Sequence, residues 1–130
     1  MAVSDAIVAA ARGCVGTRFR VQGRKAGLGL DCVGVAAVAM RAGGIRTQVP
    51  GDYRLSGDHR RLGKQIDAVA GLERVAVPGP GDLVLCVVSR SHRHLAVMTE
   101  SGFVHAHLGL GRVVETPGAP EWPIEAAWRV

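Results

Sequence analysis

The chain has 130 residues and a formal net charge of +5, with 48% hydrophobic and 21% charged residues. This length and composition predict a single globular domain over residues 1–130 and exclude a disordered chain. The positive charge favours an anionic partner, such as a cell-wall polymer, a nucleic acid or an acidic membrane surface. The longest apolar run, residues 33–40, is too short to cross a bilayer. The first residues lack the basic start of a secretory signal, so we expect cytoplasmic synthesis without a signal peptide.

Helical patterns fill the first half of the chain. Residues 4–12 have one apolar face, and Ser4 or Asp5 is the expected N-cap. A basic, glycine-rich loop over residues 22–29 precedes the run from Cys32 to Arg41, which is apolar on nearly all sides. Such a run predicts a central helix covered by other layers, with Asp31 as its N-cap and Gly43-Gly44 as its stop. Residues 58–70 predict a further helix from the spacing of Leu62, Ile66 and Val69.

Strand patterns fill the second half. They predict strands over residues 83–88, 94–99, 103–107 and 112–115, and a last edge strand over 128–130. Helices followed by an antiparallel meander indicate the α+β class. A hairpin turn near Gly102 pairs residues whose numbers sum to roughly 200–204. This register places His94 opposite or diagonal to His107, and His105 nearer to Val97 or Leu95.

The three cysteines, Cys14, Cys32 and Cys86, form neither a disulfide framework nor a zinc-binding C-x-x-C pair. Cys32 stands at the start of the central helix, where free N–H groups and the helix dipole lower a thiol pKa. The charge of Asp31 opposes that effect, so a reactive Cys32 needs a basic partner. The alternative is that Cys32 is a buried structural residue, as we expect Cys14 and Cys86 to be.

Four of the five histidines fall in the meander, and His94 begins a strand close to the expected start of the central helix. Cysteine with histidine, and a third group that orients the imidazole, is the general plan of thiol catalysis. The oxyanion then lies near the N–H of Cys32. A metal site is the alternative, but no suitably spaced carboxylate or cysteine accompanies the histidines, so we expect neither metal nor cofactor. His59 and His92 are expected at the surface.

A known family resembles this chain in five ordered blocks. Leu30-Asp31-Cys32-Val33-Gly34 resembles the Asp-Cys-Ser-Gly segment of NlpC/P60 cysteine peptidases, and Gly16-Thr17-Arg18-Phe19-Arg20 looks like the stretch before their nucleophile. Pro80-Gly81-Asp82-Leu83 matches their first core strand. The other two matches are His94-Leu95-Ala96-Val97-Met98 and Phe103-Val104-His105-Ala106, and the likeness covers residues 9–130.

The resemblance implies a papain-like fold with Cys32 as nucleophile, His94 as general base and His105 as the residue that orients His94. Phe19 and Asp31 would lie near the oxyanion and substrate. Members of this family cut peptide bonds in the stem peptides of bacterial peptidoglycan. The compact form looks most like the branch encoded with tail genes of phages or gene transfer agents, so a phage-like particle and its tail proteins are the implied location and partners.

One departure from the family pattern weakens the implied activity. Phe19 stands where the family has a tyrosine whose hydroxyl lies near the nucleophile, and the only tyrosine, Tyr53, is in another segment. Loss of one oxyanion donor costs about 10²–10³ in kcat. The alternatives are a structural or tail-assembly protein that keeps the fold, and acyl transfer or amidase action on another amide or ester. Nucleic-acid binding is disfavoured because few aromatic residues accompany the basic ones. Specificity is expected to lie in loops 22–29 and 44–57.

Overall fold

The computed structural model describes residues 2–46 and 58–130. The elements in these ranges are α1 (Val3–Gly13), β1 (Arg24–Lys25), β2 (Gly29–Leu30), α2 (Cys32–Ala42), α3 (Leu62–Asp67), β3 (Glu73–Arg74), β4 (Leu83–Val87), β5 (Arg93–Met98), β6 (Gly102–His107), β7 (Arg112–Pro117) and β8 (Ile124–Arg129). Helices come first and an antiparallel sheet follows, so the predicted α+β class is confirmed. Across the described ranges, no helix is both long and apolar enough to span a membrane.

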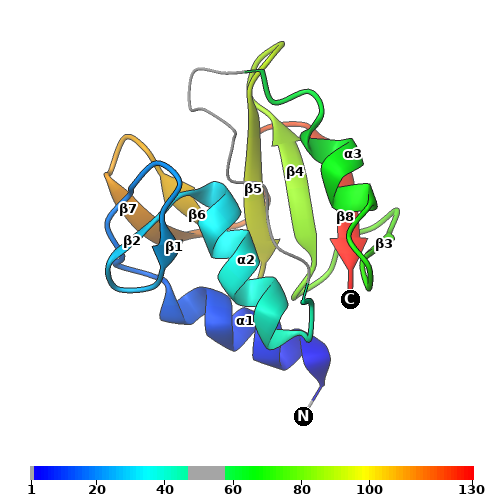
Figure 1. Cartoon of the computed structure of the whole chain (residues 1–130), viewed down its shortest axis with the longest axis horizontal. Helices are drawn as coiled ribbons and strands as arrows, with labels where there is room; N and C mark the ends of the chain where they lie inside the picture. Colours follow the sequence, from blue (N-terminus) through cyan, green and yellow to red (C-terminus); the bar gives the residue numbers. More distant parts are fainter. Residues whose placement is uncertain (1, 47–57) are drawn as a thin grey trace.

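The main sheet has the strand order β3-β8-β4-β5-β6-β7, and each neighbouring pair is antiparallel. Strands β4 to β7 form the predicted meander, and β8 returns to pair with β4. In Figure 1, α2 lies in front of the sheet, α1 lies below α2, and α3 lies beside β4 and β8. Strands β1 and β2 pair with each other in a separate two-stranded sheet, which forms a small hairpin before α2.

Each face of the sheet has its own apolar cluster. On the helix side, alternate strand residues such as Leu85, Leu95 and Val104 pack against α1, α2 and α3. On the other side, a smaller cluster is built from Val84, Cys86, Ala96, Phe103 and Ala127, and Trp122 packs on it. This division follows from the side-chain alternation of strands. Cys86 therefore belongs to a packed layer and is fully buried, as predicted.

Helix α2 begins against the β1–β2 hairpin with no space to spare. The carboxylate of Asp31 accepts a hydrogen bond from the Gly34 N–H at 2.9 Å, which confirms the predicted N-cap. A Cβ atom at Gly34 would overlap the carbonyl oxygen of Gly23. Glycine at position 34 thus lets the hairpin lie directly on the first turn of the helix, and this contact fixes where Cys32 lies.

Two helix predictions need correction. Helix α1 has Ala2 as its N-cap, with no capping side chain, so neither Ser4 nor Asp5 serves as the cap. Helix α3 covers only Leu62–Asp67 instead of 58–70. The residues before it bond to the β4–β5 turn instead: the His59 N–H donates to the Ser91 carbonyl at 2.8 Å.

The last strand was wrongly predicted at the sheet edge. Strand β8 lies between β3 and β4, and the buried Trp128 in it donates a hydrogen bond to Asp67 at 2.9 Å. The edge is β3, two exposed charged residues with no strand-like alternation in the sequence. Glu73 pairs with Arg129 and Arg74 pairs with Trp128, so β8 has a paired strand on each side.

Candidate active site

The sulfur of Cys32 lies at the start of α2, next to strand β5. Hydrogen bonds from the backbone N–H groups of Leu95 and Val33 reach it and lower its pKa. Leu95 directly follows His94 in β5. The structure therefore brings the predicted nucleophile and the predicted base onto adjoining parts of the backbone, although they are 62 positions apart in the chain.

The sheet opens at this point. The ladder between β5 and β6 pairs Val97 with Val104 and Met98 with Phe103, and these pairs give the sum 201, within the predicted range. The ladder stops there, although β5 extends back to Arg93 and β6 extends on to His107. In Figure 1 the beginning of α2 lies next to β6, to the left of β5.

A chain of hydrogen bonds links His94 to β7. His94 Nε2 and His105 Nδ1 are 2.8 Å apart, and His105 Nε2 lies 2.9 Å from Thr116 Oγ1. His94 thus contacts His105 directly, and the sequence-based register that placed it opposite or diagonal to His107 does not describe this contact. The paired ladder between the two strands ends at Val97 and Val104, before His94. The expected pairing of His94 with His105 as a catalytic unit rests on this geometry and stays a proposal.

These side chains line one pocket of about 250 Å³. Cys32 is partly exposed, whereas Cys14 and Cys86 are fully buried. Phe19 lines the pocket as well, and its position carries no hydroxyl group. The pocket wall consists of Phe19, Val21, Asp31, Cys32, His59, Val88, His92, Arg93, His94, His105, Ala106, His107, Leu108, Gly109 and Trp122.

Asp31 lines the pocket but is already engaged. It is 97% buried, its Oδ1 lies 3.0 Å from the Arg24 guanidinium, and its other oxygen accepts the Gln22 N–H. Burial raises its pKa, against the hydrogen bonds and Arg24, which lower it. Asp31 therefore caps the start of α2, and its charge raises the pKa of Cys32. Its carboxylate has little hydrogen-bonding capacity left for a substrate.

The protonation of the site differs from what the sequence predicts. Burial raises the pKa of Cys32 to about 11, and the charge of Asp31 adds to this effect, while N–H groups and Arg24 only reduce it. The helix-start N–H group of Val33 does lower this pKa and Asp31 raises it, as expected, but burial outweighs the lowering effect. Burial also lowers the pKa of His94 to about 4, helped by the charges of His105 and His107, and burial lowers that of His105 to about 4. Near neutral pH the site holds a thiol and two neutral imidazoles.

Two histidines expected at the surface belong to the pocket. His59 is only 7% exposed, and its Nδ1 accepts a hydrogen bond from the Arg93 N–H at 3.3 Å. Its ring lies 5.0 Å from that of His92, centre to centre, and both line the pocket. Both histidines lie in basic loops, which indicated solvent exposure. The loop that contains His59 instead bonds to the β4–β5 turn and to the start of β5.

Two other residues near His94 and His105, Thr116 and Trp122, were not among the residues predicted from the sequence. Thr116 follows the predicted fourth strand by one residue, and alternation along β7 would have placed it beside His105 if that strand had been extended. Trp122 lies in the connection between β7 and β8. Its ring is 5.3 Å from His94 and 6.1 Å from His105, centre to centre, with the rings edge to face. Nothing in its sequence neighbourhood indicates this contact.

No group of three metal-ligating side chains forms within residues 2–46 and 58–130. The histidines of the pocket instead bond to one another and to main-chain groups. The other expected source of a hydroxyl, Tyr53, lies outside the described residues.

No protein-family model matches this sequence, and no curated protein matches it either. Solved structures do match. NlpC2 and NlpC1 from Trichomonas vaginalis each superpose with a TM-score of 0.70, at 12% and 15% identity, and each match covers 98% of this chain. This chain spans 48% and 45% of those two proteins. The NlpC/p60 domain of the peptidoglycan hydrolase SagA has a TM-score of 0.64 and 22% identity, with 98% of both chains covered. The fold is therefore that of NlpC/P60 domains.

Proposed function

We propose that this protein is a thiol hydrolase that cleaves peptide bonds in bacterial peptidoglycan stem peptides, with Cys32, His94 and His105 as its catalytic residues. The observation that carries the proposal is the 2.8 Å contact between His94 and His105 in a pocket whose wall also holds the Cys32 sulfur. Two neutral imidazoles that contact each other in the same pocket as a thiol can act as a proton relay for it.

The hydrogen bonds assign the proton positions in this relay. Because His94 Nε2 faces His105, only Nδ1 remains to accept the thiol proton. A base at Nδ1 requires the hydrogen of neutral His94 to be on Nε2, where it donates to His105 Nδ1. His105 then carries its own hydrogen on Nε2 and donates it to Thr116 Oγ1. His105 and Thr116 thereby hold His94 in the tautomer that general-base catalysis needs.

The reaction then follows from these positions. As the Cys32 sulfur attacks the carbonyl carbon of the scissile amide, its proton moves to His94 Nδ1. The resulting imidazolium gives that proton to the departing amine, the C–N bond breaks, and a thioester on Cys32 remains. Water, deprotonated by His94, hydrolyses the thioester and restores the thiol. Because burial raises the pKa of Cys32, the resting thiol is neutral, and His94 has to take its proton for the attack to occur.

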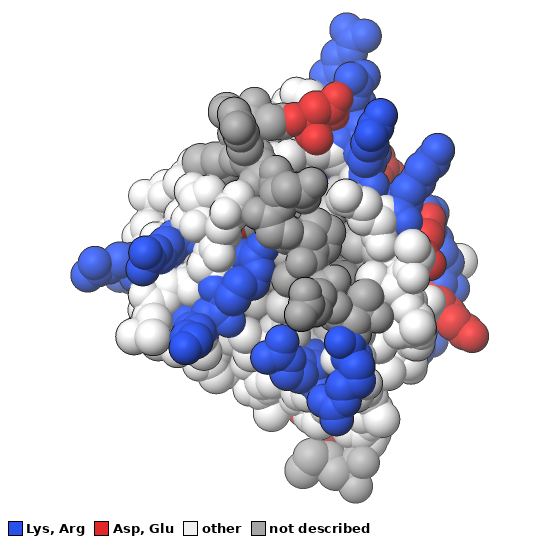
Figure 2. Space-filling model, in the orientation of Figure 1, with Lys and Arg blue, Asp and Glu red and all other residues white. Residues whose placement is uncertain are grey.

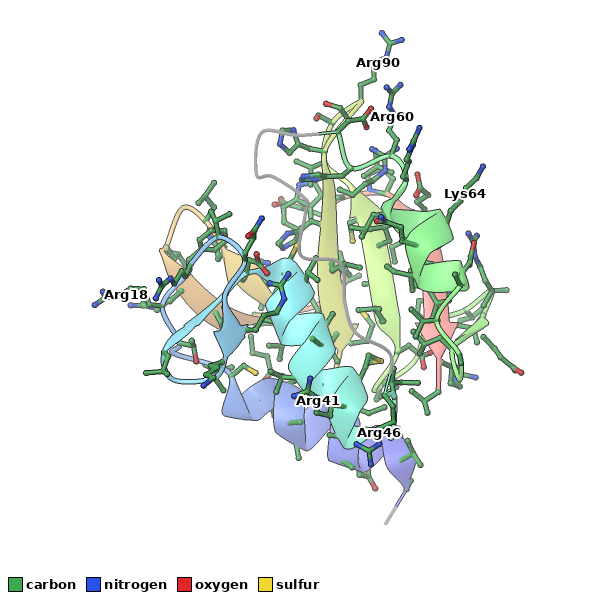
Figure 3. The ribbon with its side chains drawn as sticks, viewed as in Figure 1. Arg18, Arg41, Arg46, Arg60, Lys64 and Arg90 are labelled. Carbon is green, nitrogen blue, oxygen red and sulfur yellow. The ribbon has the colours of Figure 1, made fainter. Side chains whose placement is uncertain are left out.

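The surface charge supports an anionic polymer as substrate. Figure 2 shows lysine and arginine side chains spread over the visible face with few acidic ones among them. Figure 3 labels six that project outward from different elements: Arg18, Arg41, Arg46, Arg60, Lys64 and Arg90. Wall peptides carry carboxylates, so a basic surface raises the local concentration of such a substrate. The likeness to SagA, which is named as a peptidoglycan hydrolase, points the same way.

Digestion of purified sacculi and muropeptides, with products identified by mass spectrometry, tests the proposal. Wild type is expected to release new peptide fragments, and Cys32→Ala to release none. Cys86→Ala is the matched control, since it removes a thiol that lies within β4. Absence of fragments from wild type at high enzyme concentration and several pH values would refute the peptidase assignment.

The second candidate is a structural or tail-assembly protein that keeps the fold without useful catalysis. Phe19 and the raised pKa of Cys32 favour it. In that case Cys32 reacts with alkylating reagents no faster than an ordinary buried thiol, whereas the relay predicts base-assisted reaction. Incorporation into a phage-like particle is a separate proposal that applies to either candidate, and detection of the protein in purified particles tests it.

A further inference from the structure

Few side chains of the pocket are left to donate a hydrogen bond to a substrate. His94 and His105 bond to each other. The Arg93 guanidinium donates to Glu125 at 3.0 Å and to main-chain carbonyls of the β4–β5 turn. Phe19 has a ring but no donor. A developing oxyanion needs more than the single N–H at the start of α2, because two or more donors are the usual arrangement.

His107 provides a donor whose direction is fixed. Its Nδ1 accepts a hydrogen bond from the Leu110 N–H at 3.0 Å. A backbone N–H can only donate, so Nδ1 has no hydrogen and the neutral ring carries its hydrogen on Nε2. The turn folds closely around the ring, since a Cβ atom at Gly109 would lie 3.1 Å from His107 Cε1. Ring orientation and tautomer are therefore both set before any substrate binds.

The same turn is joined to the segment that contains Phe19. The Phe19 N–H donates to the Gly111 carbonyl at 2.8 Å, and the backbones of Arg18 and Arg112 form an isolated antiparallel β-bridge. Phe19 and His107 thus reach the pocket from backbone segments bonded to each other, and both line its wall. His107 also lies close to the relay, with its ring centre 5.6 Å from that of His105.

We propose that His107 donates its Nε2 hydrogen to the carbonyl oxygen of the substrate and so supplies the hydrogen bond that Phe19 cannot make. This inference rests on the proposed thiol chemistry of Cys32. As the sulfur bonds to the carbonyl carbon, the C=O electron pair moves onto oxygen, and the Cys32 N–H and His107 stabilise the charge. When the tetrahedral intermediate collapses, the pair returns and the leaving group departs.

Two reactions of Cys32 separate this role from a structural one. Acylation by p-nitrophenyl acetate passes through an oxyanion: sulfur bonds to the acetyl carbon, p-nitrophenolate leaves, and the thiol proton goes to His94. Alkylation by iodoacetamide is a direct displacement of iodide that forms no oxyanion. Both are followed on Cys32 by peptide mapping at about pH 8, where His94 and His105 are neutral.

The expected result is that His107→Phe slows acylation by about 10²–10³ and leaves alkylation within a few-fold of wild type. His107→Gln, which keeps an N–H donor, should recover part of the loss, and Phe19→Tyr in the His107→Phe background should recover most of it. In the wild-type background Phe19→Tyr should have a much smaller effect because a donor is already present. Only the wild-type arm of this comparison is free of a change at His107.

Equal slowing of acylation and alkylation in His107→Phe would overturn the inference, as would an equal effect of Phe19→Tyr in both backgrounds. Failure of the proposed function has a different signature. Wild type would then leave muropeptides intact, while the ratio of acylation to alkylation would still respond to His107.

Discussion

Replacing Trp122 by leucine should raise the pKa of His94. The Trp122 ring lies edge-on to His94 at 5.3 Å, and burial is the largest cause that holds this pKa at about 4. Leucine removes the flat cover while keeping an apolar side chain on the second cluster of the sheet. Water then reaches the imidazole, and its charged form is stabilised.

The size of the effect follows from the depression of this pKa. The ordinary value of 6.5 exceeds about 4 by 2.5, which corresponds to about 3.4 kcal/mol at about 1.36 kcal/mol for each tenfold change in acidity. A pKa rise of about 2.5 is therefore the upper limit, reached only if the His94 ring became fully exposed. The charges of His105 and His107 remain in the variant, and Trp122 is only part of the cover. We therefore expect the pKa to rise by about one, toward 5.

Titration of the histidine Cε1–Hε1 signals by NMR measures this shift without reference to activity. Trp122→Phe, which keeps an aromatic cover, should leave the His94 midpoint near that of wild type. A Trp122→Leu variant that folds normally and titrates His94 at the wild-type midpoint would show that this ring does not set the pKa. In activity, the same shift should move the acid limb of the pH profile upward, since only neutral His94 accepts the thiol proton.

Three further outcomes are expected. Folding stability should fall as pH drops from about 6.5 to about 4, because the unfolded chain binds protons at His94 and His105 that the folded chain does not; urea titrations at several pH values measure it, and a flat profile would contradict the pKa values. Asp31→Asn should cost about 1 kcal/mol by weakening the cap of α2, yet lower the thiol pKa of Cys32, as read from the absorbance of the thiolate at high pH; an unchanged or higher pKa would argue against the charge effect. Gly34→Ala should destabilise the fold by several kcal/mol in thermal unfolding, whereas Gly13→Ala, with open space around its Cβ, should be near neutral; similar melting temperatures would disprove the close hairpin contact.

The sequence predicted the framework of the site well, because that framework depends on local patterns. Asp31 before an apolar run is a capping signal, and it places Cys32 at a helix start. The turn at Gly102 fixes the β5–β6 register to within one or two residues. Alternation then assigns His105 to the same face as Phe103, which is where it lies, at 4.6 Å between ring centres.

What the sequence could not supply depends on contacts between distant segments. The β5–β6 ladder ends before His94 and His105, and no local pattern shows where a ladder ends. Trp122 and His59 approach the pocket from connections whose path is set by the packing of other elements. The pKa of Cys32 is set mainly by burial, which opposes the helix-start effect that position alone suggests.

Competitive alkylation of the three cysteines by iodoacetamide, in wild type and in His94→Ala, tests the central claim most directly. If the Cys32 thiol and the His94 imidazole act together in one open pocket, wild type should be modified at Cys32 while Cys14 and Cys86 stay intact. The His94→Ala change should slow that modification by about 10² or more, because the thiol loses its base. Modification of Cys32 at the same rate in both proteins, or no faster than at Cys14 and Cys86, would contradict the account.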